Sequence, residues 1–269
     1  MIVNENIEYL QKHYPVMLSL SIADLRIGAH MMVLRLSDGS IGLASSEPDD
    51  QIHCAKENRD FGDFTPLKII GKSLSQLFNT SKTTAQVNTL RIAAINAVSN
   101  TINRNKSARI IRNADLIDLL NPDKSRKVVM VGAFHSYIRK IIASGWQLNV
   151  LELNRNAMFP EHLEYYYPDD KYPEVLHDAG IVIITGLTLV NNTFDDLIKA
   201  CPEEAQIAII GPSSNLISEV LFSKNISIIG STLITRPELV FDLVSQGAAG
   251  FHLFEYCAEK VFILNDKKH

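Results

Sequence analysis

The feature that most constrains the fold is a series of short, predominantly apolar runs in the second half of the chain. Five runs lie at residues 128–131, 148–151, 181–184, 207–210 and 226–229, and residues 261–264 are a sixth candidate. Runs of this length that are rich in Ile and Val, separated by amphipathic stretches, are typical of strands buried on both faces of a parallel sheet. The sequence therefore predicts an α/β fold for this half.

Residues 1–112 have a different pattern, which predicts a smaller α+β domain. Residues 4–24 and 84–102 carry apolar side chains at helical spacing, with Pro15 as a candidate break in the first stretch. Between them, Asp38-Gly39 separates two apolar stretches and favours a hairpin turn, because both positions tolerate positive φ. We therefore expect helices on a small antiparallel sheet over 1–112 and the α/β domain over 113–269.

Composition excludes several classes of protein. With 269 residues, 46% of them hydrophobic and 21% charged, the chain can bury a core, which excludes disordered, collagenous and small disulfide-rich proteins. The net charge of −4 argues against a nucleic-acid partner. We expect no membrane association and a cytoplasmic location, because no apolar run approaches ~18 residues and the first residues lack the pattern of a secretion signal. The three cysteines form no C-x-x-C pair, which suits a reducing compartment, and Cys201 is expected to be a core thiol.

The candidate site lies at the ends of the predicted strands, where small, hydroxylated and amide residues recur. The carboxyl ends of parallel strands share one edge of a sheet, and ligands of open α/β sheets bind there. Each residue alone is also typical of a helix N-cap or a tight turn, but five such strand ends together favour a pocket. The candidate ligand-binding residues at these ends are Gly132, Phe134, His135, Glu152, Asn154, Thr185, Gly186, Thr188, Asn191, Asn192, Thr193, Gly211, Pro212, Ser213 and Ser214.

Glu152 follows Gly132 by 20 residues, which is the interval at which a dinucleotide fold places the carboxylate that binds ribose hydroxyls. The glycine fingerprint of that fold is absent, because Phe134 and Tyr137 occupy two of its positions. We therefore expect no pyrophosphate site of the usual kind, whereas a nucleoside or another small polar ligand stays open. The alternative for Glu152 is a solvated carboxylate at the end of a strand.

Two histidines are candidates for chemistry. His135, at the start of the helix after the first strand, can be a base, a metal ligand, a cap or a surface residue. His53 and Cys54 lie near several carboxylates in an irregular stretch and form a candidate metal site, although free cysteines are often plain core residues.

Two further features have open alternatives. Asn96 inserts an amide into an apolar helix face and needs a hydrogen-bond partner, either in the chain or in a ligand between the domains. Residues 155–173 form a long, tyrosine-rich connection, which is typical of a lid, a partner contact or a packed surface loop.

Several strings together resemble a known family of bacterial and archaeal proteins. They are Ile41-Gly42-Leu43-Ala44-Ser45, Ala94-Ile95-Asn96-Ala97, Val131-Gly132-Ala133-Phe134, the run from Thr185 to Thr193 with the pattern T-G-x-T-x-V-N-x-T, and Gly211-Pro212-Ser213-Ser214. In this order they resemble the family described as "putative heavy-metal chelation". The resemblance implies an enolase-N-terminal-like first domain, a Rossmann-like second domain and a site between them.

These observations lead to three expectations about function. The first is a protein that binds a small polar ligand, a metal ion or a metal chelate in a cleft between the domains. The second is an enzyme that uses a nucleoside-type cofactor such as S-adenosylmethionine, with Glu152 on the ribose and His135 in proton transfer. The third is an interaction module in which the tyrosine-rich loop meets a partner or a second copy of the chain. The residues signal no nucleophile and base pair, so no reaction is assigned.

Overall fold

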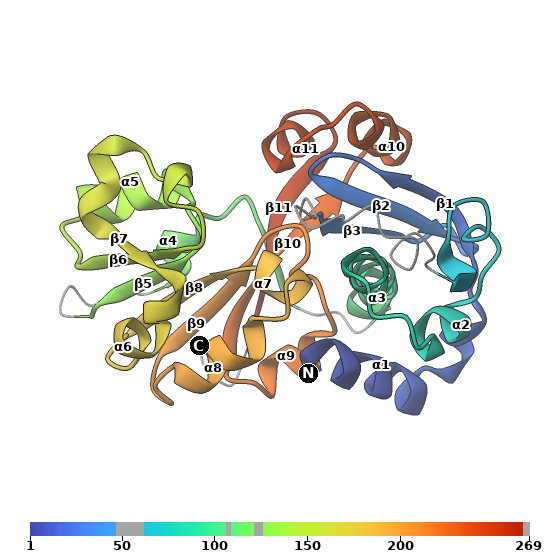
Figure 1. Cartoon of the computed structure of the whole chain (residues 1–269), viewed down its shortest axis with the longest axis horizontal. Helices are drawn as coiled ribbons and strands as arrows, with labels where there is room; N and C mark the ends of the chain where they lie inside the picture. The colour runs from blue at the N-terminus through green and yellow to red at the C-terminus, as the bar shows by residue number, and fades with distance from the viewer. Residues whose placement is uncertain (47–61, 106–108, 121–125, 266–269) are drawn as a thin grey trace.

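The computed structural model describes residues 1–46, 62–105, 109–120 and 126–265, which form a mixed α/β fold with two sheets (Figure 1). The larger sheet has eight strands and the smaller, antiparallel sheet has three. The expected combination of an α/β sheet with a smaller α+β unit is confirmed. Candidate residues His53 and Cys54 lie outside the described residues.

The large sheet has the strand order β4-β11-β10-β9-β8-β5-β6-β7. Pairing is parallel from β10 to β7, whereas β11 runs antiparallel to both β10 and β4. All five predicted runs are strands, and the sixth candidate is the antiparallel β11. The bounds are β4 (Ile110–Arg112), β5 (Val128–Val131), β6 (Leu148–Glu152), β7 (Tyr166–Pro168), β8 (Ile181–Thr185), β9 (Gln206–Ile210), β10 (Ile226–Ile234) and β11 (Ala258–Leu264).

The strand order reverses between β5 and β8. The chain runs from β5 outward through β6 to β7, and it then returns to place β8 on the other side of β5. At such a reversal the connections leave in opposite directions, which opens a crevice outside the carboxyl ends of the strands. The topology therefore places the candidate ligand site at the ends of β5, β6 and β8.

Helices cover both faces of the large sheet, as the apolar runs predict. Met130 and Ile183 pack with α4 (Leu116–Leu119) and α5 (His135–Ala143). Val129 and Ile184 join the cluster on the opposite face. The helices of that cluster are α6 (Tyr172–Leu176), α7 (Leu187–Val190), α8 (Phe194–Ala200) and α9 (Ser218–Phe222), together with α1 (Ile2–His13) and α3 (Ala85–Asn105).

The small sheet is formed by β1 (Ile22–Ile27), β2 (Met31–Leu36) and β3 (Ile41–Ser45). The hairpin predicted at Asp38-Gly39 is confirmed, since β2 and β3 pair antiparallel around it. The helix expected over residues 84–102 is α3. The helix expected over residues 4–24 is wrong in its second half, because α1 ends at His13, the 3₁₀ helix η1 (Pro15–Ser19) begins at Pro15, and β1 follows. The other elements of this unit are the 3₁₀ helix η3 (Gly62–Phe64) and α2 (Leu74–Asn79).

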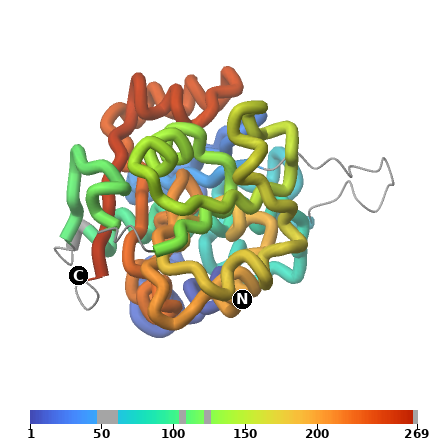
Figure 2. The backbone as a smooth tube through the Cα atoms, turned by 90° about the vertical axis from the view of Figure 1, so that its left-hand side faces the viewer, coloured from blue at the N-terminus to red at the C-terminus, as the bar shows by residue number. Residues whose placement is uncertain are grey.

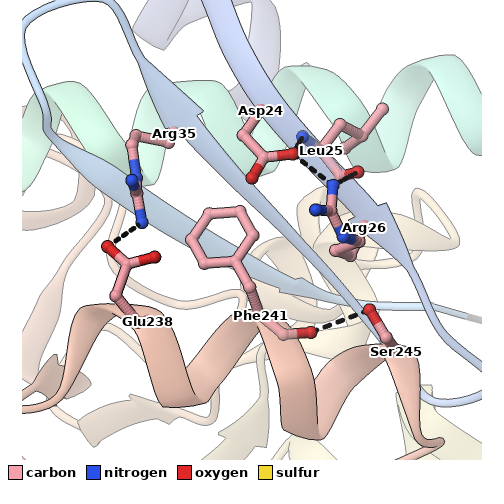
Figure 3. A network of polar contacts seen from close by, with 7 residues as sticks. All are labelled: Asp24, Leu25, Arg26, Arg35, Glu238, Phe241 and Ser245. Atoms are coloured by element: carbon pink, nitrogen blue, oxygen red, sulfur yellow. Dashed lines mark hydrogen bonds and ion pairs between the residues drawn. The ribbon is translucent and has the colours of Figure 1, made fainter.

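Two helices from the end of the chain cover the outer face of the small sheet. While α3 packs on one face, α10 (Pro237–Ser245) and α11 (Gly250–Tyr256) close the other, as Figure 1 shows. Phe241 is 4% exposed and packs against this sheet, where the guanidinium groups of Arg35 and Arg26 lie 4.8 Å and 5.9 Å from its ring centroid (Figure 3). Arg35 also pairs with Glu238 at 2.6 Å. The three-stranded sheet therefore depends on residues near the C-terminus for its second apolar layer.

None of the helices that the structure describes is both long enough and apolar enough to cross a bilayer.

Candidate functional site

A cavity of about 410 Å³ lies at the predicted edge of the large sheet, at the ends of β5, β6 and β8. Its volume is within the range of small-molecule sites. The turn after β5 contributes Gly132 and Phe134, and the end of β6 contributes Glu152. Thr185 and the segment after it form the opposite wall. Eight predicted site residues line this cavity: Gly132, Phe134, Glu152, Thr185, Thr188, Asn191, Asn192 and Thr193.

Gly132 allows the ends of β5 and β8 to approach each other. Its φ is +99°, and a Cβ atom built at this position lies 3.1 Å from the Cβ of Thr185. Both the left-handed backbone and the close neighbour favour glycine here. The glycine thus shapes the floor of the cavity without contributing a polar group.

The Glu152 carboxylate is held by backbone donors on two loops. One oxygen accepts a hydrogen bond from the N–H of Ala133 at 2.9 Å, and the other accepts one from the N–H of Asn154 at 3.0 Å. Each carboxylate oxygen has a second lone pair, so Glu152 can still accept hydrogen bonds from a ligand. The residue therefore fixes the turn after β5 and also presents an acceptor at the end of β6.

Local hydrogen bonds hold the segment after β8, which forms one wall of the cavity. Thr188, which is 3% exposed, donates its hydroxyl to the carbonyl oxygen of Thr185 at 2.7 Å, and Thr193 donates to the side-chain oxygen of Asn191 at 2.7 Å. Asn88 of α3 donates to the carbonyl oxygen of Val190 at 2.9 Å and lies 3.5 Å from the side-chain oxygen of Asn192. Asn88 thus links α3 of the N-terminal unit to this wall of the cavity.

The tyrosine-rich connection contributes residues that the sequence analysis did not select. It folds into the 3₁₀ helices η4 (Arg155–Ala157), η5 (Pro160–Tyr165) and η6 (Asp169–Lys171), with β7 between the last two. This part of the chain faces the viewer in Figure 2. Asp169, Asp170 and Tyr172 line the cavity from this side, and Asp196 of α8 joins them. No local motif marks these residues, because only the pairing of β7 with β6 brings them to the strand ends.

The lining of this cavity is acidic. Among the described residues that line it, every charged side chain is a carboxylate, from Glu152, Asp169, Asp170 and Asp196. Asp196 forms an ion pair with Lys199 at 3.1 Å, and both of these side chains are exposed. The field inside the cavity therefore favours a neutral or cationic ligand over a phosphate.

A second cavity of about 240 Å³ adjoins Phe134 as well. It includes the predicted residues Gly211 and Pro212 at the end of β9, and Phe134 lines both cavities. The cleft that we expected between the domains stays a prediction, because neither of these two cavities includes a described residue of the N-terminal unit. Their described lining residues all fall between positions 131 and 262.

Four of the predicted residues line neither cavity, and two of them, Asn96 and Ser213, hold the two halves of the chain together. Asn96 donates to the carbonyl oxygens of Leu43 at 2.6 Å and Pro212 at 3.2 Å. Ser213 accepts a hydrogen bond from the N–H of Ser45 at 2.7 Å. The Ser214 hydroxyl lies within hydrogen-bond distance of the carbonyl oxygens of Gly211 and Gly230. Gly186 lies against this segment, since a Cβ atom there is 2.9 Å from the nitrogen of Ser214.

His135 and Asn154 also lie outside the lining of both cavities. The His135 ring stacks on Phe159 with centroids 3.7 Å apart, and Asn154 caps η4 by accepting from the N–H of Asn156 at 3.0 Å. The proton-transfer role expected of His135 therefore has no support from the geometry of these cavities.

Comparison with known proteins decides the family. Two family models, both described as "putative heavy-metal chelation", match residues 115–263 and residues 15–99. The chain belongs to this family. The match confirms the resemblance that the sequence strings indicate. No functionally curated protein matches the chain.

Two solved structures of the same family share the fold. A protein of unknown function from Pyrococcus horikoshii is 20% identical, with a TM-score of 0.78 over 98% of this chain and all of that chain. A protein of unknown function from Desulfitobacterium hafniense is 18% identical, with a TM-score of 0.71 over 98% of each chain. At this identity the likeness establishes the arrangement of both sheets and nothing about ligands.

The metal implied by the family description does not fit the described residues. Within residues 1–46, 62–105, 109–120 and 126–265, no three His, Cys, Asp or Glu side chains are grouped to hold an ion. Heavy metals favour thiolate ligands. Burial raises the pKa of the Cys201 thiol to about 12, and Cys257 is 1% exposed. Neither described cysteine is therefore available as a thiolate at neutral pH.

Proposed function

We propose that this chain binds a small polar organic ligand without phosphate groups in the cavity at the ends of β5, β6 and β8. The observation that carries the proposal is the position and charge of this cavity, which lies at the reversal of strand order and has only carboxylates as charged groups among its described lining residues. Such crevices are the usual ligand sites of open α/β sheets.

A nucleoside-type ligand with positive charge suits this lining best. Glu152 stands at the strand end where related folds bind ribose hydroxyls, and its oxygens retain free lone pairs. The apolar surface available to a planar base comes from four leucines, which are Leu151, Leu153, Leu187 and Leu197. S-adenosylmethionine combines a base, a ribose and a sulfonium cation without any phosphate, whereas the pyrophosphate of a dinucleotide would face carboxylates.

Calorimetry and thermal-shift measurements on the full chain test this proposal. S-adenosylmethionine and adenosine should raise the midpoint of unfolding by mass action, and NAD⁺ should have a weaker effect. Glu152→Ala and Asp170→Asn should each weaken binding about tenfold, whereas Asp118→Asn, which removes an exposed carboxylate of α4, should not.

Two results would contradict the proposal. The first is a chain that responds to none of these nucleosides. The second is a chain purified with stoichiometric metal by elemental analysis that responds to metal salts alone, because that outcome would move the site to residues outside this cavity.

A further inference from the structure

The second cavity has its own chemistry, distinct from that of the first. It lies between the start of α5, the end of β9, the middle of β10 and β11, and α11. Its walls carry aromatic rings from five residues, and Gly211 after β9, Gly230 within β10 and Gly250 at the start of α11 contribute backbone surface. The aromatic residues are Phe134, Tyr137, Phe251, Phe254 and Phe262.

Lys260 is the one charged side chain among the described residues that line this cavity. Its ammonium nitrogen lies 5.1 Å from the ring centroid of Phe254 and 5.9 Å from that of Tyr137. No carboxylate in the described parts of the chain lies within ion-pair distance of it. The N-terminal, positive end of α5 lies at the same wall, where Ser136 and Tyr137 line the cavity. The cavity thus carries the opposite charge to its neighbour.

Thr232 supplies an unpaired polar group at the same place. It is directly opposite Lys260 in the antiparallel register of β10 and β11, so both side chains project from one face of the sheet. Gly230 and Phe262, which form the next pair on that face, also line the cavity. Thr232 is 6% exposed, and its hydroxyl oxygen is buried with no hydrogen-bond partner among the described residues. Buried hydroxyls without partners are rare, and a ligand atom is one explanation.

These groups select a ligand by shape and charge. The aromatic walls favour a flat ring, since aromatic pairs are attractive in stacked and edge-to-face arrangements. A carboxylate pairs with an ammonium and accepts a hydrogen bond from a hydroxyl. The volume of about 240 Å³ limits the ligand to something smaller than a typical drug-sized molecule.

We propose that the second cavity binds a small aromatic carboxylate, with its ring against Phe134 and Phe254 and its carboxylate on Lys260 and Thr232. This site is independent of the one proposed for the first cavity. Phe134 is the wall that the two share.

Titration of the full chain with benzoate and phenylacetate by calorimetry tests the proposal. At least one of the two acids should bind with a Kd of about 1 mM or below, as expected for so small a ligand. Benzamide, benzylamine and inorganic phosphate should bind at least tenfold more weakly, because each lacks the carboxylate or the ring. Equal binding of benzamide or of phosphate overturns the proposal, as does the absence of saturable binding of both acids.

Substitutions of the lining residues test whether the aromatic acid binds in the second cavity. Lys260→Met should weaken binding of the acid at least tenfold, and Thr232→Val should weaken it severalfold, whereas Thr232→Ser keeps the hydroxyl and should bind like the parent chain. Lys68→Met is the matched control, because it removes an exposed lysine of the N-terminal unit that does not line the cavity. Asp170→Asn alters the first cavity and should leave this affinity unchanged. Unchanged affinity in a folded Lys260→Met variant overturns the assignment.

Discussion

The side chain of Asn96 in α3 donates a hydrogen bond to the carbonyl oxygen of Pro212, which lies 116 residues further along the chain at the end of β9. The same nitrogen donates to Leu43 in β3. One buried amide thus joins the small sheet, the long helix and a strand end of the large sheet.

Asn96→Ala should lower the free energy of unfolding by about 2 kcal/mol, because the buried carbonyl oxygen of Leu43 and the partly buried one of Pro212 lose their donor. Asn96→Asp should cost more, since it places a carboxylate against the same carbonyl oxygens. Urea denaturation measures both. Asn79→Ala is the matched control, because Asn79 is exposed at the end of α2 and should change stability by less than about 0.5 kcal/mol. Similar values for Asn96→Ala and Asn79→Ala would contradict the role of Asn96.

Glu152→Gln should be better tolerated than Glu152→Ala. The carboxylate accepts from the N–H groups of Ala133 and Asn154, and a glutamine retains one acceptor oxygen. We expect Glu152→Ala to cost about 1–2 kcal/mol of stability and Glu152→Gln about half of that. Chemical denaturation distinguishes them, with Glu161→Ala, an exposed carboxylate of η5, as the neutral comparison. Equal stability of all three variants would show that the Glu152 contacts contribute nothing.

Gly42→Ala should be among the most damaging small substitutions in the chain. A Cβ atom at Gly42 lies 1.9 Å from the carbonyl oxygen of Ala93 and 2.6 Å from the nitrogen of Ala97, so β3 and α3 must separate. We expect a loss of about 3 kcal/mol or more in the free energy of unfolding. Gly250→Ala is the control, because its nearest atom is at 3.9 Å in an ordinary contact. A thermal melt of the two variants gives the comparison, and equal melting temperatures would refute the close approach.

Cys201 should react slowly with thiol reagents in the native state. Burial raises the pKa of its thiol from the ordinary value of 9.0 to about 12, and burial also raises the pKa of the Cys257 thiol. In a Cys54→Ser variant, both remaining thiols should react with a disulfide reagent at pH 8 only after unfolding, since the thiolate is the reactive form. Fast reaction of the native variant would contradict this.

The same shift in pKa predicts a dependence of stability on pH. The native state holds the Cys201 proton more tightly than the unfolded chain does, so its contribution to stability is complete below pH 9. That contribution is lost as the pH rises from about 9 to about 12. Denaturation at a series of pH values should therefore show a steeper alkaline loss in the parent chain than in Cys201→Ala.

Phe241 should contribute more to the free energy of unfolding than the Arg35–Glu238 ion pair beside it. Phe241→Ala removes a ring that is 4% exposed and should cost about 3–5 kcal/mol. Glu238→Gln breaks the contact with Arg35, but the Glu238 side chain is 82% exposed, so the change should stay within about 0.5 kcal/mol. Denaturation of both variants checks the order, and a larger loss in Glu238→Gln would reverse it.

Much of the fold follows from local patterns. Strands buried on both faces leave predominantly apolar runs, and these predicted β5, β6, β8, β9 and β10. An apolar run indicates that a strand is buried but not in which direction the strand runs. The sequence therefore did not distinguish the antiparallel β11 from the parallel strands of the sheet. The short edge strands β4 and β7 lack an apolar run, because the end of a sheet buries fewer side chains.

The site was predictable only where strand ends define it. Half of the selected residues line the first cavity, because parallel strands bring their carboxyl ends to one edge. Asp169 and Asp170 were not foreseen, since they reach the cavity through a long connection whose path depends on β7. Phe134 was predicted as a pocket residue, but no sequence pattern shows that it lines two cavities.

The return of α10 and α11 to the small sheet has a consequence for biosynthesis. Residues 22–45 leave the ribosome early, yet the helices that cover their outer face are made only after residue 237. Met31, Val33 and Leu43 therefore stay uncovered on that side during most of translation. The outer face of the small sheet can therefore be covered only after all strands of the parallel part of the large sheet have been synthesised.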